Sequence, residues 1–317
     1  MTDILKDVTS YGKEQPWRER KIACAMYGEY VTKLNYKKAA RVVECGEVLR
    51  FASSGSDLRL FQAWFCHSRL CPMCNWRRAR KQSYQLSLVI NEALKQNPSA
   101  VFLFLTLTEK NASATNLRTE LQKMNASFYK LFQYKKTSKN LLGYVRSTEI
   151  TFNEKHQTYH QHAHVLLFMK STYFRDSQNY IKQAEWSQFW KRARKLNYEP
   201  IVNVKRVRPN VRRPDTSLAA SAREVAKYQV KSTDYLTGNE SRDLKVVSTL
   251  ETALNHTRQL SFGGVLKDIR QQLKLDDLDN DDSPQNLIKL GINPATGQKV
   301  TEVDYVWNPV SNNYEKW

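Results

Sequence analysis

The segment Tyr159-His-Gln-His-Ala-His-Val-Leu-Leu-Phe168 is the one around which the other elements of this chain can be placed. Side chains alternate between the two faces of a strand, so His160, His162 and His164 project from the same face. A second strand is predicted near 143–152, and the polar turn at 153–156 would join the two into a β-hairpin. We therefore expect an antiparallel sheet with the histidine strand near its centre.

The histidines of this strand predict a site for a divalent cation. Two imidazoles at positions i and i+2 can chelate a metal and leave coordination positions open. Glu149 lies on the preceding strand, where the hairpin can bring its carboxylate alongside. Mixed imidazole and carboxylate ligation suits Mg²⁺ or Mn²⁺ bound to a phosphate oxygen. We expect His162, His164 and Glu149 as ligands, with His160 as a further candidate; a zinc site made of the three histidines is the alternative.

Further strands and helices complete an α+β domain. A buried strand is predicted at 101–108 and an alternating one at 200–208. Helices are predicted at 76–96, 115–135 and 178–196 and from about 215 to 236. We expect helices on one face of the antiparallel sheet and the last helix, which carries Tyr228, approaching the other face.

Four of the five cysteines predict a structural zinc site ahead of this domain. Cys71 and Cys74 form a C-x-x-C pair, with Cys66 and Cys45 upstream, and His67 could replace Cys66. Clustered thiolates of this kind suit tetrahedral Zn²⁺. Free buried cysteines or a redox pair are the alternatives, and no thioredoxin-like βαβ pattern supports the redox reading. The zinc module would hold the basic helix that begins at Trp76-Arg-Arg.

The charge of the chain indicates a polyanionic partner. Its 317 residues carry a formal net charge of +19. Eight Lys or Arg stand against two acids in 201–231 alone. Nucleic acid is the expected partner, and anionic lipid is less favoured because no long amphipathic basic helix is present. No signal peptide or run of about 18 apolar residues is apparent, so we expect a cytoplasmic protein with no membrane partner.

The segment Arg223–Lys231 offers a nucleophile. Glu224 and Tyr228 are spaced i,i+4 and would share a helix face. A phenol with its ordinary pKa of ~10 needs nearby positive charge or a metal to attack a phosphodiester. Lys231 and the metal site could supply that charge. Taken alone, the same segment is also compatible with an ordinary surface helix.

Together these motifs resemble a known family. The order of a strand ending in Leu105-Thr-Leu-Thr108, a His-Ala-His strand and a tyrosine on a later helix is similar to that of HUH endonucleases, which have a palm-like fold. The chain looks most similar to the replication initiators (Rep proteins) of small rolling-circle plasmids, in the branch with one catalytic tyrosine and a glutamate four residues before it. The resemblance covers about residues 44–236 and includes the Cys-Pro-x-Cys followed by Trp-Arg-Arg. Gln161 stands where that family pattern leads us to expect proline.

The resemblance implies roles for these residues. His162, His164 and Glu149 would hold the catalytic metal, Tyr228 would be the nucleophile, and Glu224 would activate the water or align the group that ends the cycle. The substrate would be a plasmid double-strand origin in a bacterial cytoplasm, nicked as a single strand or hairpin through a 5′-phosphotyrosine. A host helicase is an implied partner, and a homodimer is left open.

Several alternatives remain open. A relaxase or a single-tyrosine transposase would use the same chemistry. A noncatalytic, zinc-stabilised DNA-binding regulator would explain the charge and the cysteines but not the histidine strand. Tyr235 is a second candidate nucleophile, although no carboxylate precedes it by four residues.

The expected domain order is consecutive. Residues 1–96 would form the zinc-binding and basic DNA-binding module, 97–240 the HUH endonuclease domain, and 241–317 a C-terminal helix, linker and tail of unknown role. The five aspartates within 276–282 indicate a solvated linker. Aromatic residues near the end of the chain could pack a short hairpin: Tyr305, Trp307, Tyr314 and Trp317.

Overall fold

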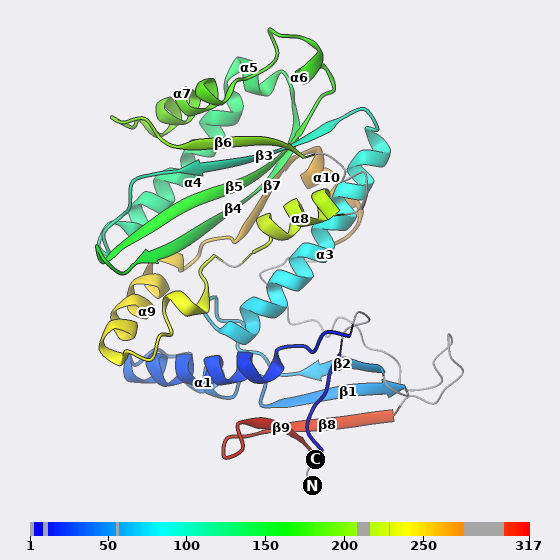
Figure 1. Ribbon diagram of the computed structural model, residues 1–317, viewed down its shortest axis with the longest axis vertical. Coiled ribbons are helices and arrows are strands. Elements are labelled where there is room, and N and C mark those ends of the chain that lie inside the picture. Colours follow the sequence, from blue (N-terminus) through cyan, green and yellow to red (C-terminus); the bar gives the residue numbers. More distant parts are fainter. Residues whose placement is uncertain (1–2, 9–11, 55–56, 208–215, 228, 276–300) are drawn as a thin grey trace. The chain divides into compact units, whose positions relative to one another are not determined.

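The computed structural model describes residues 3–8, 12–54, 57–207, 216–227, 229–275 and 301–317. It contains two compact units, each built from segments far apart in the sequence (Figure 1). We call the first the cysteine unit; it consists of Met1–Arg77, Leu236–Val247 and Asp279–Trp317. We call the second the histidine unit; it consists of Arg78–Tyr235 and Ser248–Leu278. These units divide the chain differently from the three consecutive domains that the sequence suggested.

The histidine unit is built on a five-stranded antiparallel sheet in the order β6-β3-β5-β4-β7. The histidine strand, β5, is the middle strand, and the predicted α+β class with an antiparallel sheet is confirmed. Strand β7 was not predicted, because its five residues include two glycines and lack a clear alternation. The strands are β3 (Val101–Thr108), β4 (Leu141–Asn153), β5 (Thr158–Met169), β6 (Val202–Val207) and β7 (Leu260–Gly264).

The register of the sheet places the site residues on one face. In the β4–β5 hairpin, Glu149 lies opposite His162 and Ser147 lies opposite His164. On the other side of β5, Thr106 of β3 lies opposite His164. Residues directly opposite each other in an antiparallel pair point to the same face of the sheet. The carboxylate, both imidazoles and the threonine therefore share that face.

Helices cover both faces of this sheet (Figure 1). On one face, α4 (Leu117–Gln133) and α7 (Gln183–Arg194) bury Phe128, Trp186 and Trp190 against β3 and β5. On the histidine face, the later part of α3 (Pro72–Gln96) packs with α8 (Thr216–Val225) and α10 (Val265–Gln272). We had expected only the tyrosine helix there. The face needs this wider cover because the β5 side chains Leu166 and Phe168 are apolar on it.

Helix α8 ends at Val225, so the predicted helix to residue 236 is wrong. The next residues form a turn, and a short 3₁₀ helix, η1, follows at Ser232–Asp234. The carbonyl of Gln229 accepts a hydrogen bond from the backbone N–H of Ile150 at 2.7 Å. Strand β4 pairs with β7 only as far as Ser147, so the N–H of Ile150 needs another acceptor, and Gln229 supplies it. This tertiary contact overrides the helix propensity of the sequence after Val225. Tyr228 lies outside the described residues, and so does its predicted place on a helix face with Glu224.

The cysteine unit contains a four-stranded antiparallel sheet in the order β2-β1-β8-β9. The expected C-terminal hairpin is present as β8 and β9, and β8 pairs with β1, near the start of the chain. Helices α1 and α2 and strands β1 and β2 were not predicted. The elements are α1 (Trp17–Lys33), α2 (Ala39–Val43), β1 (Val48–Ser54), β2 (Asp57–Ala63), β8 (Thr301–Asn308) and β9 (Asn313–Lys316).

The remaining helices lie in the chain between the elements already described. Helix α9 (Glu240–Leu254) follows η1, and the short helices are α5 (Lys135–Ser138) and α6 (Thr172–Arg175). The predicted acidic linker at 276–282 lies outside the described residues. Within the described ranges, none of the helices combines the length and apolar character that crossing a bilayer requires.

A buried ion-pair network ties three elements of the histidine unit together. The guanidinium of Arg194, on α7, pairs with Glu109 just after β3 and with Glu120 on α4, the latter at 2.8 Å. The side chains of Arg194 and Glu109 are only 4% and 2% exposed. Hydrogen bonds from Arg194 and Lys123 outweigh the effect of burial and lower the pKa of Glu120. Removing the cation would leave a buried carboxylate without a partner.

We expect Arg194→Met to lower the free energy of unfolding by about 3–5 kcal/mol, because Glu109 would stay buried and unpaired. Lys191→Met is the matched control on the same helix, since its partner Glu199 is more than half exposed. That control should cost about 1 kcal/mol or less. Urea unfolding followed by the fluorescence of Trp186 and Trp190 measures both. Equal losses in the two variants would contradict a structural role for the network.

Candidate metal centres

Three side chains converge on the histidine face of the sheet. The Nε2 atoms of His162 and His164 lie 3.3 Å and 3.2 Å from the same carboxylate oxygen of Glu149. One ligand atom from each of the three residues lies within 4.8 Å of the others. Adjacent antiparallel strands supply all three, so the backbone register sets their spacing. Two imidazole nitrogens and one carboxylate oxygen form a donor set that suits a divalent cation with open coordination positions.

The electrostatics of the cluster keep its carboxylate ionised. Burial by itself raises the pKa of Glu149, but hydrogen bonds from His162 and His164 outweigh it and hold the pKa well below its usual range. A deprotonated carboxylate is the form that binds a metal.

The second ring nitrogens of the two histidines differ in their surroundings. Nδ1 of His164 lies 3.4 Å from the hydroxyl of Thr106, which can hold the ring with Nε2 turned toward Glu149. Nδ1 of His162 is buried and has no hydrogen-bond partner among the described residues. A buried imidazole with an unsatisfied nitrogen is costly unless a further ligand or water meets it. The sequence did not single out Thr106, although its position opposite a histidine follows from strand pairing.

His160 lies outside the three-residue cluster. Its Nδ1 is 3.0 Å from the side-chain oxygen of Asn111. Burial and the neighbouring His162 lower the pKa of His160. The structure therefore brings together three of the four predicted ligands. The third member of the cluster is Glu149 and not His160. The cluster therefore differs from the alternative site made of three histidines.

Helix α8 brings a second carboxylate to the cluster. Oε1 of Glu224 lies 3.9 Å from Nε2 of His164, and the Glu224 side chain is 35% exposed. Its other oxygen forms an ion pair with Lys227. Lys231, the predicted cation, is exposed and makes no side-chain hydrogen bond or ion pair with a described residue. The ion-pair partner of Glu224 is thus Lys227, at a spacing of i,i+3 that is also common on ordinary helix surfaces.

The residues that flank position 228 are held at the edge of β4. The carbonyl of Gln229 is bonded to the N–H of Ile150, and Ile150 directly follows Glu149. The carbonyl of Lys227 accepts a hydrogen bond from the side chain of Gln259 at 2.7 Å. Tyr235, the alternative nucleophile, is fully buried in the described structure, which leaves its hydroxyl out of reach of a DNA strand.

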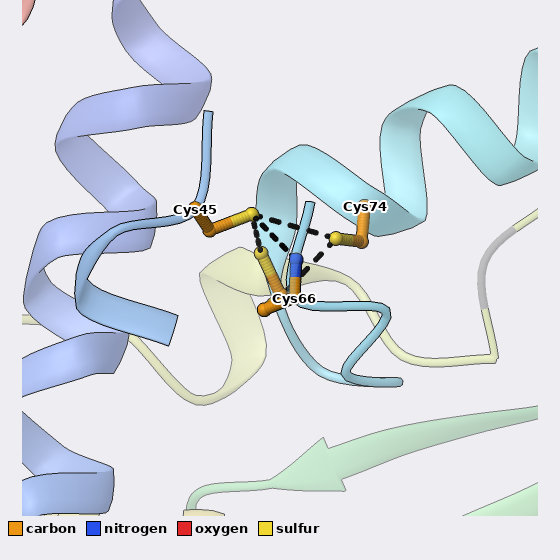
Figure 2. Close-up of side chains that lie close together, drawn as sticks. Cys45, Cys66 and Cys74 are labelled. Carbon is orange, nitrogen blue, oxygen red and sulfur yellow. Dashed lines mark hydrogen bonds between the residues drawn. The ribbon is translucent and has the colours of Figure 1, made fainter. Parts of the chain in front are cut away.

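The cysteine unit holds the second cluster, and Figure 2 shows Cys45, Cys66 and Cys74 pointing toward one another. Their thiols come from the loop before β1, the loop after β2 and the start of α3. Sγ of Cys45 lies 3.5 Å from that of Cys74 and 3.6 Å from that of Cys71, and Cys66 lies 3.6 Å from Cys74. All four thiols are buried and within 4.8 Å of one another. The group contains Cys66 and not its alternative, His67.

These separations fit a tetrahedral metal. Four sulfurs at the ordinary Zn–S distance of about 2.3 Å would lie about 3.8 Å apart. Backbone N–H groups of Cys66 and Ser68 point at the sulfurs of Cys45 and Cys66, an arrangement that favours thiolate. The cluster could therefore hold zinc.

Two buried neighbours of this cluster were not anticipated from the sequence. Sγ of Cys24, on α1, lies 3.4 Å from that of Cys71. The ammonium of Lys21, one turn earlier, donates to the carbonyl of Cys45 at 2.9 Å. Cys24 stands 21 residues before the first predicted ligand, and nothing in the local pattern connects it to the C-x-x-C pair.

Comparisons with known proteins agree with one another. The chain is 57% identical over 316 residues to the protein named Protein rep of Lentilactobacillus hilgardii, covering 99% of each chain. It is 50% identical to Protein rep of Lactiplantibacillus plantarum, over the full length of both. It is 38% identical to Protein rep of Streptococcus pneumoniae, covering 98% of this chain and 95% of the relative. No solved structure matches the chain.

A family model described as Replication protein matches residues 57–315, a range that includes the histidine cluster, α8 and most of the cysteine cluster. On this match and on relatives that span the whole chain, the protein belongs to the Replication protein family.

Proposed function

We propose that this chain initiates rolling-circle replication of a plasmid by nicking one DNA strand at the double-strand origin, with Tyr228 as the nucleophile. The main support for this proposal is the cluster of Glu149, His162 and His164, with the carboxylate of Glu224 3.9 Å from the imidazole of His164. A noncatalytic DNA-binding regulator would have no use for this arrangement. Membership in the Replication protein family favours replication over a relaxase or a transposase with the same chemistry.

The cluster would bind a divalent cation and, through it, the scissile phosphate. Its two imidazoles and its ionised carboxylate would hold Mg²⁺ or Mn²⁺ and leave open positions for phosphate oxygens. A cation held there would polarise the phosphate and stabilise the negative charge that develops during attack. Thr106 would keep the ring of His164 oriented.

Tyr228 would carry out the strand transfer. Its phenolic oxygen attacks phosphorus and loses its proton, while the bond from phosphorus to the 3′-oxygen breaks and that oxygen gains a proton. The products are a 5′-phosphotyrosine and a free 3′-hydroxyl that primes synthesis. One phosphoester replaces another, so rejoining needs no ATP. The hydrogen bond from Ile150 to Gln229 supports this role, because it ties a neighbour of position 228 to the residue after Glu149.

Glu224 would end the cycle as a general base. Its carboxylate, which forms an ion pair with Lys227, would accept a proton from a water attacking the phosphotyrosine. The 3.9 Å separation from His164 places this carboxylate beside the metal cluster. Lys231 remains a proposed cation for the phenolate. Its exposure would weaken that attraction, because solvent screens the charge.

The remaining parts of the proposal concern binding. The net charge of +19 suits a DNA origin presented as a single strand or a hairpin. The cysteine cluster would hold a structural Zn²⁺ and stabilise the start of α3 with its arginines. A host helicase would unwind the nicked plasmid, and association into a homodimer is compatible with the proposal.

We expect Tyr228→Phe to abolish both nicking of a supercoiled origin plasmid and the covalent protein–DNA band on a denaturing gel, because no phenolic oxygen remains to attack. Tyr129→Phe is the matched control, since Tyr129 is 70% exposed on α4 and takes no part in the site. Tyr235→Phe should keep the adduct. A surviving adduct in Tyr228→Phe, confirmed by mass spectrometry of the nucleotidyl peptide, would reject the assignment.

We expect Glu224→Gln to spare the first nick and to slow hydrolytic release by about 10²–10⁴-fold, the range typical of a lost general base. Single-turnover reactions on an origin oligonucleotide would follow formation and decay of the adduct separately. Accumulation of the adduct is the expected signature. If both steps fell by the same factor, Glu224 would act on binding or on the metal and not on water.

We expect the purified full chain to contain about one zinc ion per molecule by inductively coupled plasma mass spectrometry. Cys74→Ser should lose the ion and lower the melting temperature, because binding energy of a structural metal is folding energy. Cys24→Ser is the control, since Cys24 lies beside the four-thiol group but outside it. Zinc loss in Cys24→Ser with retention in Cys74→Ser would overturn the proposed ligand set.

A further inference from the structure

A cavity of the histidine unit has a volume of about 420 Å³. It lies away from the group Glu149, His162 and His164, which we call the metal cluster. Its walls come from α4, β4, the end of α9 and the turn before β7, and its polar lining includes Arg118, Arg146, Arg258, His256, Asn125 and Asn255. None of its lining residues is acidic. We refer to it as the arginine pocket.

The arginine pocket is on the sheet face opposite to the metal cluster. Arg146 lies opposite Val165 of β5 and Ser261 of β7, so these three residues share a face. Val165 belongs to the core that α4 and α7 cover. The next residue of β4, Ser147, lies opposite His164 and points the other way. One strand thus contributes to two sites on opposite faces.

Arg146 carries a charge that the described residues do not neutralise. Its Nη1 donates to the side-chain oxygen of Asn125 at 2.6 Å, and its guanidinium stacks over the ring of Phe128 at 4.5 Å. Burial lowers the pKa of Arg146, and no described carboxylate offsets that effect. A cation withdrawn from water without a counter-charge is costly, which makes the site receptive to an anion.

The other two arginines reinforce this preference. Arg118 donates from Nη1 to the carbonyl of Thr252 at 3.0 Å, and none of the described carboxylates pairs with it. Arg258 is exposed and forms no ion pair with a described residue. It follows a tight turn in which His256 adopts a positive φ of 58°. Three guanidiniums from three different elements therefore line one cavity.

We propose that the arginine pocket binds a nucleotide phosphate, supplied by the DNA strand that the metal cluster cuts. Guanidinium groups match phosphate oxygens in charge and geometry and can bind them through paired hydrogen bonds. The volume suits a nucleotide unit and exceeds the needs of a lone ion. That the pocket binds phosphate stands on its own residues; that the phosphate belongs to DNA rests on the proposed function. The pocket would add affinity for DNA flanking the nick and take no part in the chemistry.

The test compares Arg118→Gln/Arg258→Gln with Arg175→Gln in the full chain. The first removes two charges from the pocket at accessible positions. The second removes an exposed arginine of α6 that makes no contact with the pocket. Arg146→Gln is a further variant, and its melting temperature without ligand shows whether it still folds.

Two probes separate the sources of phosphate. Thermal shift with dAMP and with inorganic phosphate reports binding without any DNA cleavage. Fluorescence anisotropy with a labelled single-stranded origin oligonucleotide, without added Mg²⁺ or Mn²⁺ so that no nicking occurs, reports DNA binding. We expect dAMP to stabilise the parent chain and Arg175→Gln but not the double variant. We also expect the double variant to bind the oligonucleotide about tenfold or more weakly. Its salt dependence should fall by about 0.7 in slope, for one lost phosphate contact on a single strand.

Each result decides one part of the proposal. If the double variant matches Arg175→Gln with both probes, the arginine pocket is not a phosphate site. If dAMP stabilisation is lost while oligonucleotide binding is unchanged, the pocket takes free nucleotides and the DNA assignment is overturned. Stabilisation by inorganic phosphate alone would overturn the nucleotide assignment. None of these outcomes depends on whether Tyr228 attacks DNA, so failure here and failure of the nicking proposal are distinguishable.

Discussion

The pairing register of β4 with β5 is the constraint on which the cluster of Glu149, His162 and His164 depends. Glu149 lies opposite His162 because the hairpin turn and the long run of backbone hydrogen bonds align the two strands residue by residue. A slip of one residue would turn the carboxylate to the opposite face, among the apolar side chains under α4 and α7. The apolar pattern on both faces opposes such a slip, so packing energy protects the geometry of the site.

The same register explains how one strand serves two kinds of chemistry. Alternation sends Glu149 toward the imidazoles and Arg146, three residues earlier, toward the arginine pocket. The sheet between them is filled by apolar side chains, and it separates a carboxylate that stays ionised from a guanidinium that lacks a counter-charge. The two faces of β4 thus present groups suited to ligands of opposite charge, a cation on one face and an anion on the other.

Local patterns were enough to predict the centre of the histidine unit. Alternating histidines and an apolar run in β5, with a polar turn before them, indicate a hairpin without any information from distant segments of the chain. The end of α8 at Val225 was beyond such reasoning, because it depends on the N–H of Ile150 meeting the carbonyl of Gln229. Likewise, β8 completes the sheet of the cysteine unit through a pairing with β1, about 250 residues away, that no local signal encodes.

Around the histidine cluster, sequence patterns pointed to the residues that one hairpin brings together and did not single out Thr106, which the pairing of β3 with β5 adds. Glu224 was identified by its spacing to Tyr228, yet in the structure its carboxylate lies 3.9 Å from Nε2 of His164, across the packing of α8 on the sheet. That contact does not need a shared helix face. A turn after Val225 leaves the carboxylate on the helix and frees the following residues to reach along the edge of β4. The break in the helix therefore brings Gln229 to the edge of β4 while Glu224 stays beside His164, which a continuous helix could not do.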